Sequence, residues 1–216
     1  MYNDRMPDEA FEIRICTSCG LRYPLVAGHP FGTRCPACMG ETRLAHRRII
    51  TAEPARSLRD AALHPGPRIA VLLDNIRSAW NTGSILRSAD GFGFSQAYLC
   101  GITPTPDQEA VTRTSLGAED SVPWSYHKDA LKLARGLKKE GFDLVALEEH
   151  ERAADIRHVR GFTYDSVLIV GNEVTGVDPE LLELADRLLT IPMLGVKRSL
   201  NVAIAFGIAA YALSHP

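Results

Sequence analysis

The chain lacks long apolar runs: the longest, residues 202–213, is too short to span a bilayer. Residues 1–12 are polar and acidic, without the apolar core of a signal peptide. The sequence also has no P-loop and no His-Glu-x-x-His metal motif. We therefore expect a cytoplasmic protein without a membrane partner, and neither P-loop nucleotide chemistry nor metalloprotease chemistry is expected.

A dinucleotide-binding fingerprint is missing as well. Gly91-Phe92-Gly93 looks like its start, but Gln96 stands at the third glycine position, and the segment follows a predicted helix instead of preceding one. The end of a helix explains these glycines better than a nucleotide-binding loop does.

A strong net charge is also absent, because 24 Lys and Arg residues against 26 Asp and Glu give a formal charge of −2. Any RNA contact must therefore come from a local basic patch. The charge is uneven: residues 1–70 hold ten basic and seven acidic residues, whereas residues 71–216 hold fourteen and nineteen. At 216 residues, the chain has room for one ordinary globular domain and a small extra module.

Cysteine is scarce, but four of the five cysteines form two close pairs that are fifteen residues apart. Gly20 and Gly40 follow the pairs, where tight turns would let backbone amides point at sulfur. The spacing is typical of a structural zinc site, and we interpret residues 1–48 as a zinc ribbon. A rubredoxin-like iron site is an alternative, and unconnected or disulfide-bonded cysteines are a further one. The expected ligands are Cys16, Cys19, Cys35 and Cys38.

Residues 49–67 are interpreted as a linker, within a linker-like stretch at 43–67 that holds Arg47, Arg48 and three prolines. The stretch is either a solvated connector or an arginine-bearing arm that holds phosphates beside the ribbon. A helix near residues 52–62 could instead pack on the main domain.

From Arg68 onward, apolar strands alternate with helical patterns, which indicates an α/β domain with a mainly parallel sheet. In such sheets, ligands bind at the carboxyl ends of the strands. There the sequence places Gly171-Asn172-Glu173-Val174-Thr175-Gly176 and Ser199-Leu200-Asn201, which predict a small-molecule site. The predicted strands are 69–73, 97–101, 144–147, 167–170 and 188–191, and the predicted helices are 83–91, 128–140, 179–184 and 200–213.

Three segments resemble the motifs of the SpoU-type, TrmH-like RNA ribose 2′-O-methyltransferases, in the family's order and with family-like intervals. The resemblance covers residues 68–214 and leaves the cysteine pairs outside. Three motifs in register are far more specific than any one of them. The segments are Asn81-Thr82-Gly83-Ser84-Ile85-Leu86-Arg87-Ser88-Ala89, then residues 171–176, and then Ile191-Pro192-Met193 with Ser199-Leu200-Asn201-Val202-Ala203.

The resemblance implies a trefoil-knotted α/β domain over residues 68–216, a homodimer, and S-adenosylmethionine bound in the knot. Glycine in the knot loops would permit close backbone approach, and Pro192 would stiffen a turn. The apolar closing helix would serve both the core and the dimer interface. The implied cofactor-binding residues, which act largely through their backbone, are Leu147, Gly171, Gly176, Ile191, Met193 and Leu200.

The resemblance also assigns catalytic residues. A ribose 2′-hydroxyl is a poor nucleophile at neutral pH, so methyl transfer needs alignment and a group that accepts the proton or stabilises charge. Arg87 would clamp a phosphate and stabilise the incipient alkoxide, because a guanidinium stays protonated and cannot act as a base. A phosphate oxygen or water could take the proton. Asn81 would orient the ribose or position Arg87. Glu173 and Asn201 would fix the loops and the substrate, and Ser199 would bond the cofactor or the substrate.

Each of these residues has a structural alternative. Asn81 could cap the helix predicted near Gly83, and Ser199 could cap the last helix. Glu173 could be an ordinary turn carboxylate, and Arg87 a solvated cation. Their joint occurrence favours the enzyme.

We therefore predict an S-adenosylmethionine-dependent 2′-O-methyltransferase that acts on a ribose in structured RNA, with tRNA favoured. An rRNA substrate is one alternative. A non-catalytic RNA-binding protein that retains the knot is another.

Overall fold

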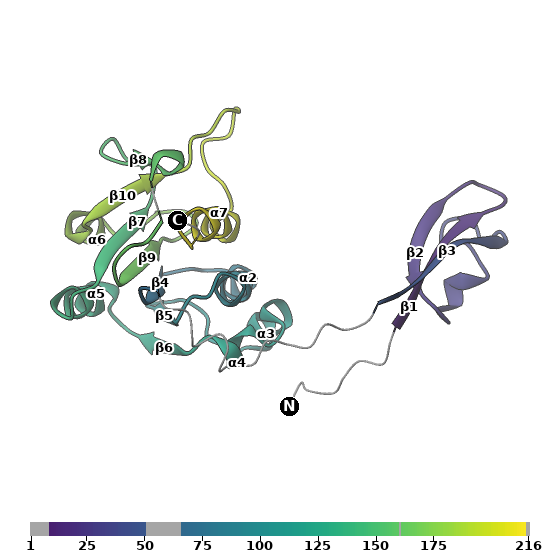
Figure 1. Ribbon diagram of the computed structural model, residues 1–216, viewed down its shortest axis with the longest axis horizontal. Coiled ribbons are helices and arrows are strands. Elements are labelled where there is room, and N and C mark those ends of the chain that lie inside the picture. Colours follow the sequence, from purple (N-terminus) through teal and green to yellow (C-terminus); the bar gives the residue numbers. More distant parts are fainter. Residues whose placement is uncertain (1–8, 51–65, 160, 215–216) are drawn as a thin grey trace. The chain divides into compact units, whose positions relative to one another are not determined.

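A computed structural model describes residues 9–50, 66–159 and 161–214. The chain divides into two compact units, Met1–Ser57 and Leu58–Pro216 (Figure 1). The helix predicted near residues 52–62 lies outside the described residues. Within the described ranges, every helix is too short or too polar to cross a membrane.

The first unit contains an antiparallel three-stranded sheet with the order β2-β1-β3. A 3₁₀ turn at Pro30–Gly32 lies in the loop between the second and third strands. The strands are β1 (Glu9–Cys16), β2 (Arg22–Val26) and β3 (Thr42–Ile50).

The arginines at 43, 47 and 48 belong to β3, where they pair with residues of β1. The prediction of a linker-like stretch that starts at Arg43 is therefore wrong. Charge density suggested a connector, but the sequence carried no sign of the strand partner that holds this segment.

The second unit is built on a seven-stranded sheet in which every pairing is parallel, with the order β6-β5-β4-β9-β7-β10-β8. The five predicted apolar strands are confirmed within one or two residues. The sequence missed two edge strands, one because it is polar and the other because it is only two residues long. The strands are β4 (Ile69–Asp74), β5 (Gln96–Cys100), β6 (Trp124–His127), β7 (Asp143–Leu147), β8 (Ala154–Asp155), β9 (Ser166–Val170) and β10 (Arg187–Thr190).

Helices cover both faces of this sheet (Figure 1). On one face lie α2 (Ala79–Gly91), α3 (Glu109–Ser115), α4 (Ala118–Ser121) and α7 (Val202–Ser214), and on the other lie α5 (Ala130–Lys139) and α6 (Pro179–Leu184).

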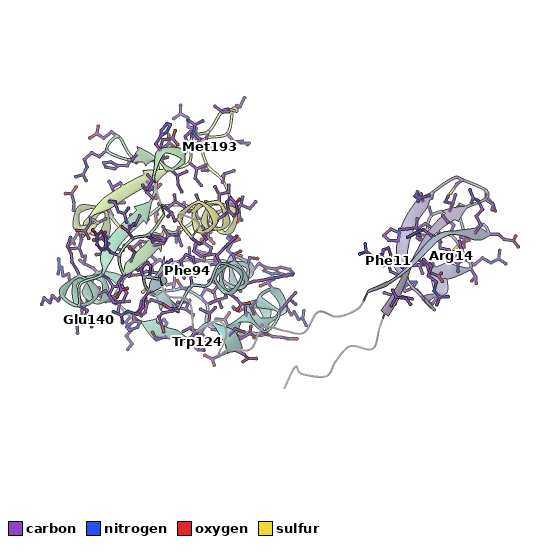
Figure 2. All side chains as sticks on the ribbon, viewed as in Figure 1. Phe11, Arg14, Phe94, Trp124, Glu140 and Met193 are labelled. Carbon is purple, nitrogen blue, oxygen red and sulfur yellow. The ribbon has the colours of Figure 1, made fainter. Side chains whose placement is uncertain are left out.

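Each face of the sheet has its own hydrophobic core, and alternate side chains of each strand pack into one core or the other. In β4, Val71 and Leu73 pack toward α2 and α7, whereas Leu72 packs toward α5. Phe94, labelled in Figure 2, meets Phe206 of α7 edge-on with ring centroids 5.2 Å apart. A sheet buried on both faces needs continuous apolar strands, which is why the central strands were predictable from the sequence.

The helix α2 begins four residues before the predicted start at Gly83. Ser78 caps it, since the Ser78 hydroxyl accepts the N–H of Asn81 at 3.3 Å. The alternative that Asn81 caps this helix is therefore wrong. A Cβ on Gly83 would lie 2.3 Å from the carbonyl oxygen of Val111, so only glycine lets α2 cross α3 this closely.

Candidate active site and metal centre

A cavity of about 620 Å³ lies at the carboxyl ends of β9, β7 and β10, three neighbouring strands of the sheet. Its wall comes from residues 147–150 after β7, 170–176 after β9, 190–193 after β10, and the segment 195–205 that leads into α7. Met193, labelled in Figure 2, lies just beyond the end of β10. The volume falls within the range of about 300–1,000 Å³ that small-molecule sites occupy.

The loop after β9 folds back on itself tightly. Asn172 and Gly176 exchange two backbone hydrogen bonds of 3.0 and 2.9 Å, and the Asn172 side chain accepts the N–H of Val174. A Cβ on Gly171 would lie only 2.2 Å from the nitrogen of Val177. Glycine at this position is therefore a requirement of the loop itself, and it brings the backbone to the cavity wall.

Two carboxylates that the sequence did not single out hold the end of this loop. Glu148, directly after β7, accepts the N–H of Val177 at 2.9 Å. Asp74, the last residue of β4, accepts the N–H of Asp178 at 2.8 Å and is 2% exposed. Burial raises the pKa of Asp74, against the lowering effect of the Asp178 amide. An acidic residue directly at the end of an apolar strand was the available signal for both.

A chain of side-chain hydrogen bonds joins all three motifs. Asn81 donates to Glu173 at 2.8 Å, and its carbonyl oxygen accepts from the amide of Asn201 at 3.0 Å. Glu173 also accepts the backbone N–H groups of Arg77 and Ser78, at 2.8 and 3.1 Å. Partial desolvation alone would raise the pKa of Glu173, but these donors outweigh it and hold the pKa below its usual range.

Asn201 has a second function, because its side-chain oxygen accepts the N–H of Ala203 at 2.9 Å and so caps α7. The alternative that Ser199 caps this helix is therefore wrong. Ser199 is exposed on the cavity wall, and within the described residues it makes no hydrogen bond.

Arg87 is set apart from the cavity wall. It lies in α2, six residues after Asn81 and therefore about 9 Å further along the helix axis. Its side chain is exposed, and in the described part of the chain it has neither a hydrogen bond nor an ion pair. The structure thus leaves this cation available to a ligand.

The remaining wall is mixed in character. All six residues expected at the cofactor line the cavity: Leu147, Gly171, Gly176, Ile191, Met193 and Leu200. The wall also contains polar residues that the sequence did not suggest: Glu149, His150, Lys197 and Arg198. The cavity can therefore hold a ligand that combines an apolar ring with charged groups.

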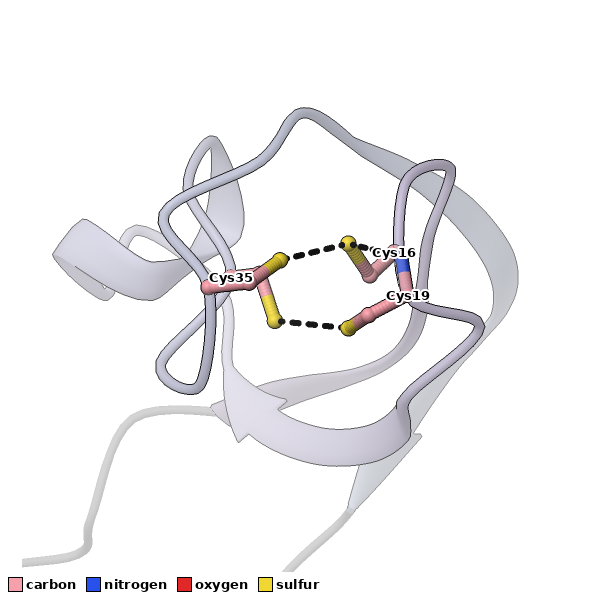
Figure 3. A group of neighbouring side chains, drawn as sticks. Cys16, Cys19 and Cys35 are labelled. Carbon is pink, nitrogen blue, oxygen red and sulfur yellow. Dashed lines mark hydrogen bonds between the residues drawn. The ribbon is translucent and has the colours of Figure 1, made fainter.

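The four paired cysteines of the first unit converge, and each offers a sulfur within 4.8 Å of the others. The sulfurs of Cys16 and Cys38 are 3.5 Å apart, and those of Cys19 and Cys35 are 3.7 Å apart (Figure 3). A tetrahedral site with Zn–S bonds of about 2.3 Å has sulfur–sulfur edges of about 3.8 Å. These two distances are close to such an edge, and they are too long for a disulfide, which needs sulfurs about 2.05 Å apart.

Both cysteine pairs lie in turns of the same form. Cys16 bonds to residues 20 and 21, and Cys35 bonds to residues 39 and 40, through equivalent backbone hydrogen bonds. The fifth residue of each turn has a positive φ, 77° at Gly20 and 59° at Met39. Gly40 has another function, since a Cβ there would lie 2.5 Å from the Ser18 hydroxyl of the other turn.

Comparison with known sequences assigns the second unit to a protein family. The profile of the SpoU rRNA methylase family matches residues 68–211. The chain belongs to this family. A tRNA (guanosine(18)-2′-O)-methyltransferase of Thermus thermophilus is 35% identical over 145 residues, which cover 67% of this chain and 73% of that protein. The Aquifex aeolicus protein of the same name is 29% identical and covers 76% of each chain.

Solved structures of SpoU methyltransferases share the fold. The AdoMet-bound rRNA methyltransferase from Sinorhizobium meliloti gives a TM-score of 0.64 at 31% identity, over 76% of this chain and 61% of that chain. The A. aeolicus TrmH/SpoU tRNA-modifying enzyme gives 0.65 at 29% identity, over 73% and 79%. The family predicted from the three motifs is confirmed, and so is the α/β fold with a mainly parallel sheet.

Proposed function

We propose that this protein transfers a methyl group from S-adenosylmethionine to a ribose 2′-hydroxyl of RNA, with tRNA as the favoured substrate. The observation that carries the proposal is the cavity at which the second and third SpoU motifs meet and to which Asn81 of the first is hydrogen-bonded. The tRNA (guanosine(18)-2′-O)-methyltransferase at 35% identity supports tRNA and makes guanosine 18 the first nucleotide to test.

The cavity suits S-adenosylmethionine, which joins an adenine ring to a charged methionine. Leu147, Ile191 and Leu200 offer apolar surface to a ring. The glycine turn after β9 offers backbone groups for polar contacts. The AdoMet-bound relative supports this assignment. The cofactor supplies an electrophilic methyl group, and the chain must then align the 2′-hydroxyl with it.

The hydrogen bonds divide the work among the motif residues. Glu173 already accepts from three donors and is held ionised, so we assign it to positioning Asn81 and the start of α2 and not to proton transfer. Asn81 links Glu173 to Asn201 and would orient the ribose. Arg87, which has no partner among the described residues, would hold an RNA phosphate and stabilise the developing alkoxide. Ser199 would bond the cofactor or the substrate.

We also propose that the chain between β10 and α7 is threaded as a trefoil knot and that the enzyme is a homodimer. The knot is supported by the match of the SpoU family profile over residues 68–211, and the bonds of Asn81 to Glu173 and Asn201 bring the two loops together. In support of the dimer, α7 leaves Ile204 56% and Ile208 40% exposed on one helix face.

For the metal centre we propose one structural zinc ion held by the four clustered cysteines. The set of four cysteine sulfurs and the two sulfur–sulfur distances of 3.5 and 3.7 Å support zinc. Iron is distinguishable by its colour and by elemental analysis. The metal would fold the ribbon and take no part in methyl transfer.

Transfer of a tritiated methyl group from S-adenosylmethionine to tRNA and to rRNA tests this function. We expect RNA-retained label with tRNA, and preferential labelling of rRNA would redirect the substrate assignment. RNA binding without any labelling, by protein that binds S-adenosylhomocysteine, would contradict the enzyme and favour a non-catalytic RNA-binding protein.

A further inference from the structure

The three-stranded sheet of the first unit has one covered face and one open face. Residues paired across antiparallel strands share a face. The face of Glu12 is covered by the loop between β2 and β3, where Tyr23 donates to the carbonyl of Phe31 at 2.5 Å and Thr42 donates to that of Gly32 at 2.6 Å. On this face Glu12 is 6% exposed and ion-paired with Arg14 at 2.7 Å.

The other face, which we name the open face, consists of three rows across the sheet. Each row has an apolar residue of β1 at its centre, with one residue of β2 and one of β3 beside it. The central residues are half-buried, and all six flanking residues are exposed. From one end to the other, the rows are Arg22, Ile15 and Arg43; Pro24, Ile13 and His46; and Val26, Phe11 and Arg48.

A β-bulge creates the cationic edge of the open face. In a regular strand Arg43 and His46 would point to opposite faces, because side chains alternate. The register shifts between Ile13 and Arg14, which leaves Ala45 as an extra residue. His46 and the following Arg48 thereby join Arg43 on one face, as bulges commonly re-aim side chains.

The basic side chains of the open face have no partner among the described residues. Arg22, Arg43, His46 and Arg48 make no side-chain hydrogen bond and no ion pair there, and the three rows contain no carboxylate. The apolar side chains of Phe11, Ile13 and Ile15 on β1 therefore lie beside the positive charges of Arg43 and Arg48 on the neighbouring strand β3.

We propose that the open face binds unpaired nucleotides of the RNA substrate, with phosphates along β3 and bases on the apolar side chains of β1. Single-stranded nucleic acid needs this combination of a positive track and an aromatic or apolar platform, and Phe11 supplies the aromatic ring. Duplex RNA hides its base faces, so it would leave the apolar platform without a partner. The assignment of the bound nucleic acid as RNA rests on the proposed function.

Fluorescence anisotropy with a short labelled oligouridylate tests the charged edge, using the full-length protein with its metal. The double variant Arg43→Ser/Arg48→Ser removes two exposed cations of the open face. We expect about tenfold weaker binding at physiological salt and a slope of log Kd against log salt reduced by about 1.4, since each phosphate contact on a single strand contributes about 0.7. The control Arg34→Ser/Arg47→Ser lies off this face and should leave both values unchanged. Arg47 is 3.9 Å from Glu12, but Glu12 keeps its 2.7 Å ion pair with Arg14 in this variant.

The variant Phe11→Leu tests the apolar side chains of β1 separately. Leucine keeps the side chain apolar, so the ribbon should retain its metal and its circular dichroism. The loss of base stacking should weaken oligouridylate binding by about five- to hundredfold without changing the salt slope.

The inference would be overturned if the unmodified protein did not bind oligouridylate, or if the two double arginine variants lost the same affinity for it. It would also be overturned if the Arg43→Ser/Arg48→Ser variant kept its RNA affinity but changed its self-association, because the open face would then be a protein interface. Methyl transfer measured on the same samples separates this inference from the enzymatic one. Methylation of RNA without oligouridylate binding contradicts only the open face, whereas oligouridylate binding without methylation contradicts only the enzyme.

Discussion

Glu173 is a motif residue whose hydrogen bonds organise the structure around it. Its two oxygens accept the N–H groups of Arg77 and Ser78 and the amide of Asn81, so it holds the first turn of α2 and one motif residue together. Its negative charge also lies at the positive end of the helix dipole, which favours the ionised form. The carboxylate thus fixes the geometry in which Asn81 presents its amide to Asn201.

Glu173→Gln should lower the thermal midpoint of the second unit at pH 7 by about 2–4 °C, because these partly solvated, charge-assisted bonds are worth about 1 kcal/mol together. The folded-state pKa is depressed. The contribution is therefore present above the ordinary glutamate pKa of about 4.3 and is lost as the pH falls through the lower folded value. Differential scanning calorimetry from pH 7 downward checks this. A difference in thermal midpoint between the unmodified protein and Glu173→Gln that grows as the pH falls would contradict it.

Arg87→Ala should reduce methyl transfer by about a hundredfold or more, as losing a charge-stabilising group does. S-adenosylhomocysteine affinity, measured by calorimetry, should stay nearly unchanged, since Arg87 does not line the cavity. Arg135→Ala, on the opposite side of the sheet, is the matched control and should keep its activity. Loss of S-adenosylhomocysteine binding in Arg87→Ala would make Arg87 a structural residue.

At the scale of elements, the sequence was informative where burial dictates composition. The apolar strand at 166–170 and the glycine turn after it were predictable because a doubly buried strand must be apolar, and because a Cβ on Gly171 would lie 2.2 Å from the nitrogen of Val177. The places of Asp74 and Glu148 at the ends of apolar strands marked both as polar candidates, but the sequence did not show that they accept the amides of Asp178 and Val177. The second cysteine turn differs from the first, because Met39 has the positive φ for which the first turn uses Gly20.

The cysteine cluster should bind one zinc ion per chain, detectable by elemental analysis of protein purified without added metal. Structural zinc sites contribute about 10–16 kcal/mol to folding, so Cys35→Ser/Cys38→Ser should unfold the ribbon. The second unit should retain S-adenosylhomocysteine binding, which serves as the control. Iron in the protein, or four thiols that alkylate readily in the folded chain, would contradict the zinc assignment.

For the whole molecule, the uneven charge and the two compact units indicate a division of labour. The unit with the cavity belongs to a net-acidic stretch, whereas the first unit carries, on its open face, arginines without a partner among the described residues. Phosphate contacts should therefore come disproportionately from the ribbon. The sequence predicted this asymmetry from charge counts, but only strand register showed which arginines share a face.

Deletion of residues 1–50, which ends with the last residue of β3, should weaken tRNA binding and flatten its dependence on salt. Cofactor binding and self-association should survive, because both are assigned to the second unit. Filter-binding titrations at several salt concentrations provide the measurement. An unchanged affinity with an unchanged salt slope would show that the ribbon serves a protein partner or the stability of the fold.

The central claim is ribose 2′-O-methylation of tRNA, and its most direct test is a map of 2′-O-methyl groups in RNA from cells with and without the gene. We predict that one 2′-O-methylated nucleotide in tRNA disappears with the gene, returns with the intact chain, and stays absent with Arg87→Ala. Unchanged ribose methylation in tRNA, together with the loss of a base methylation or of an rRNA site, would contradict the claim.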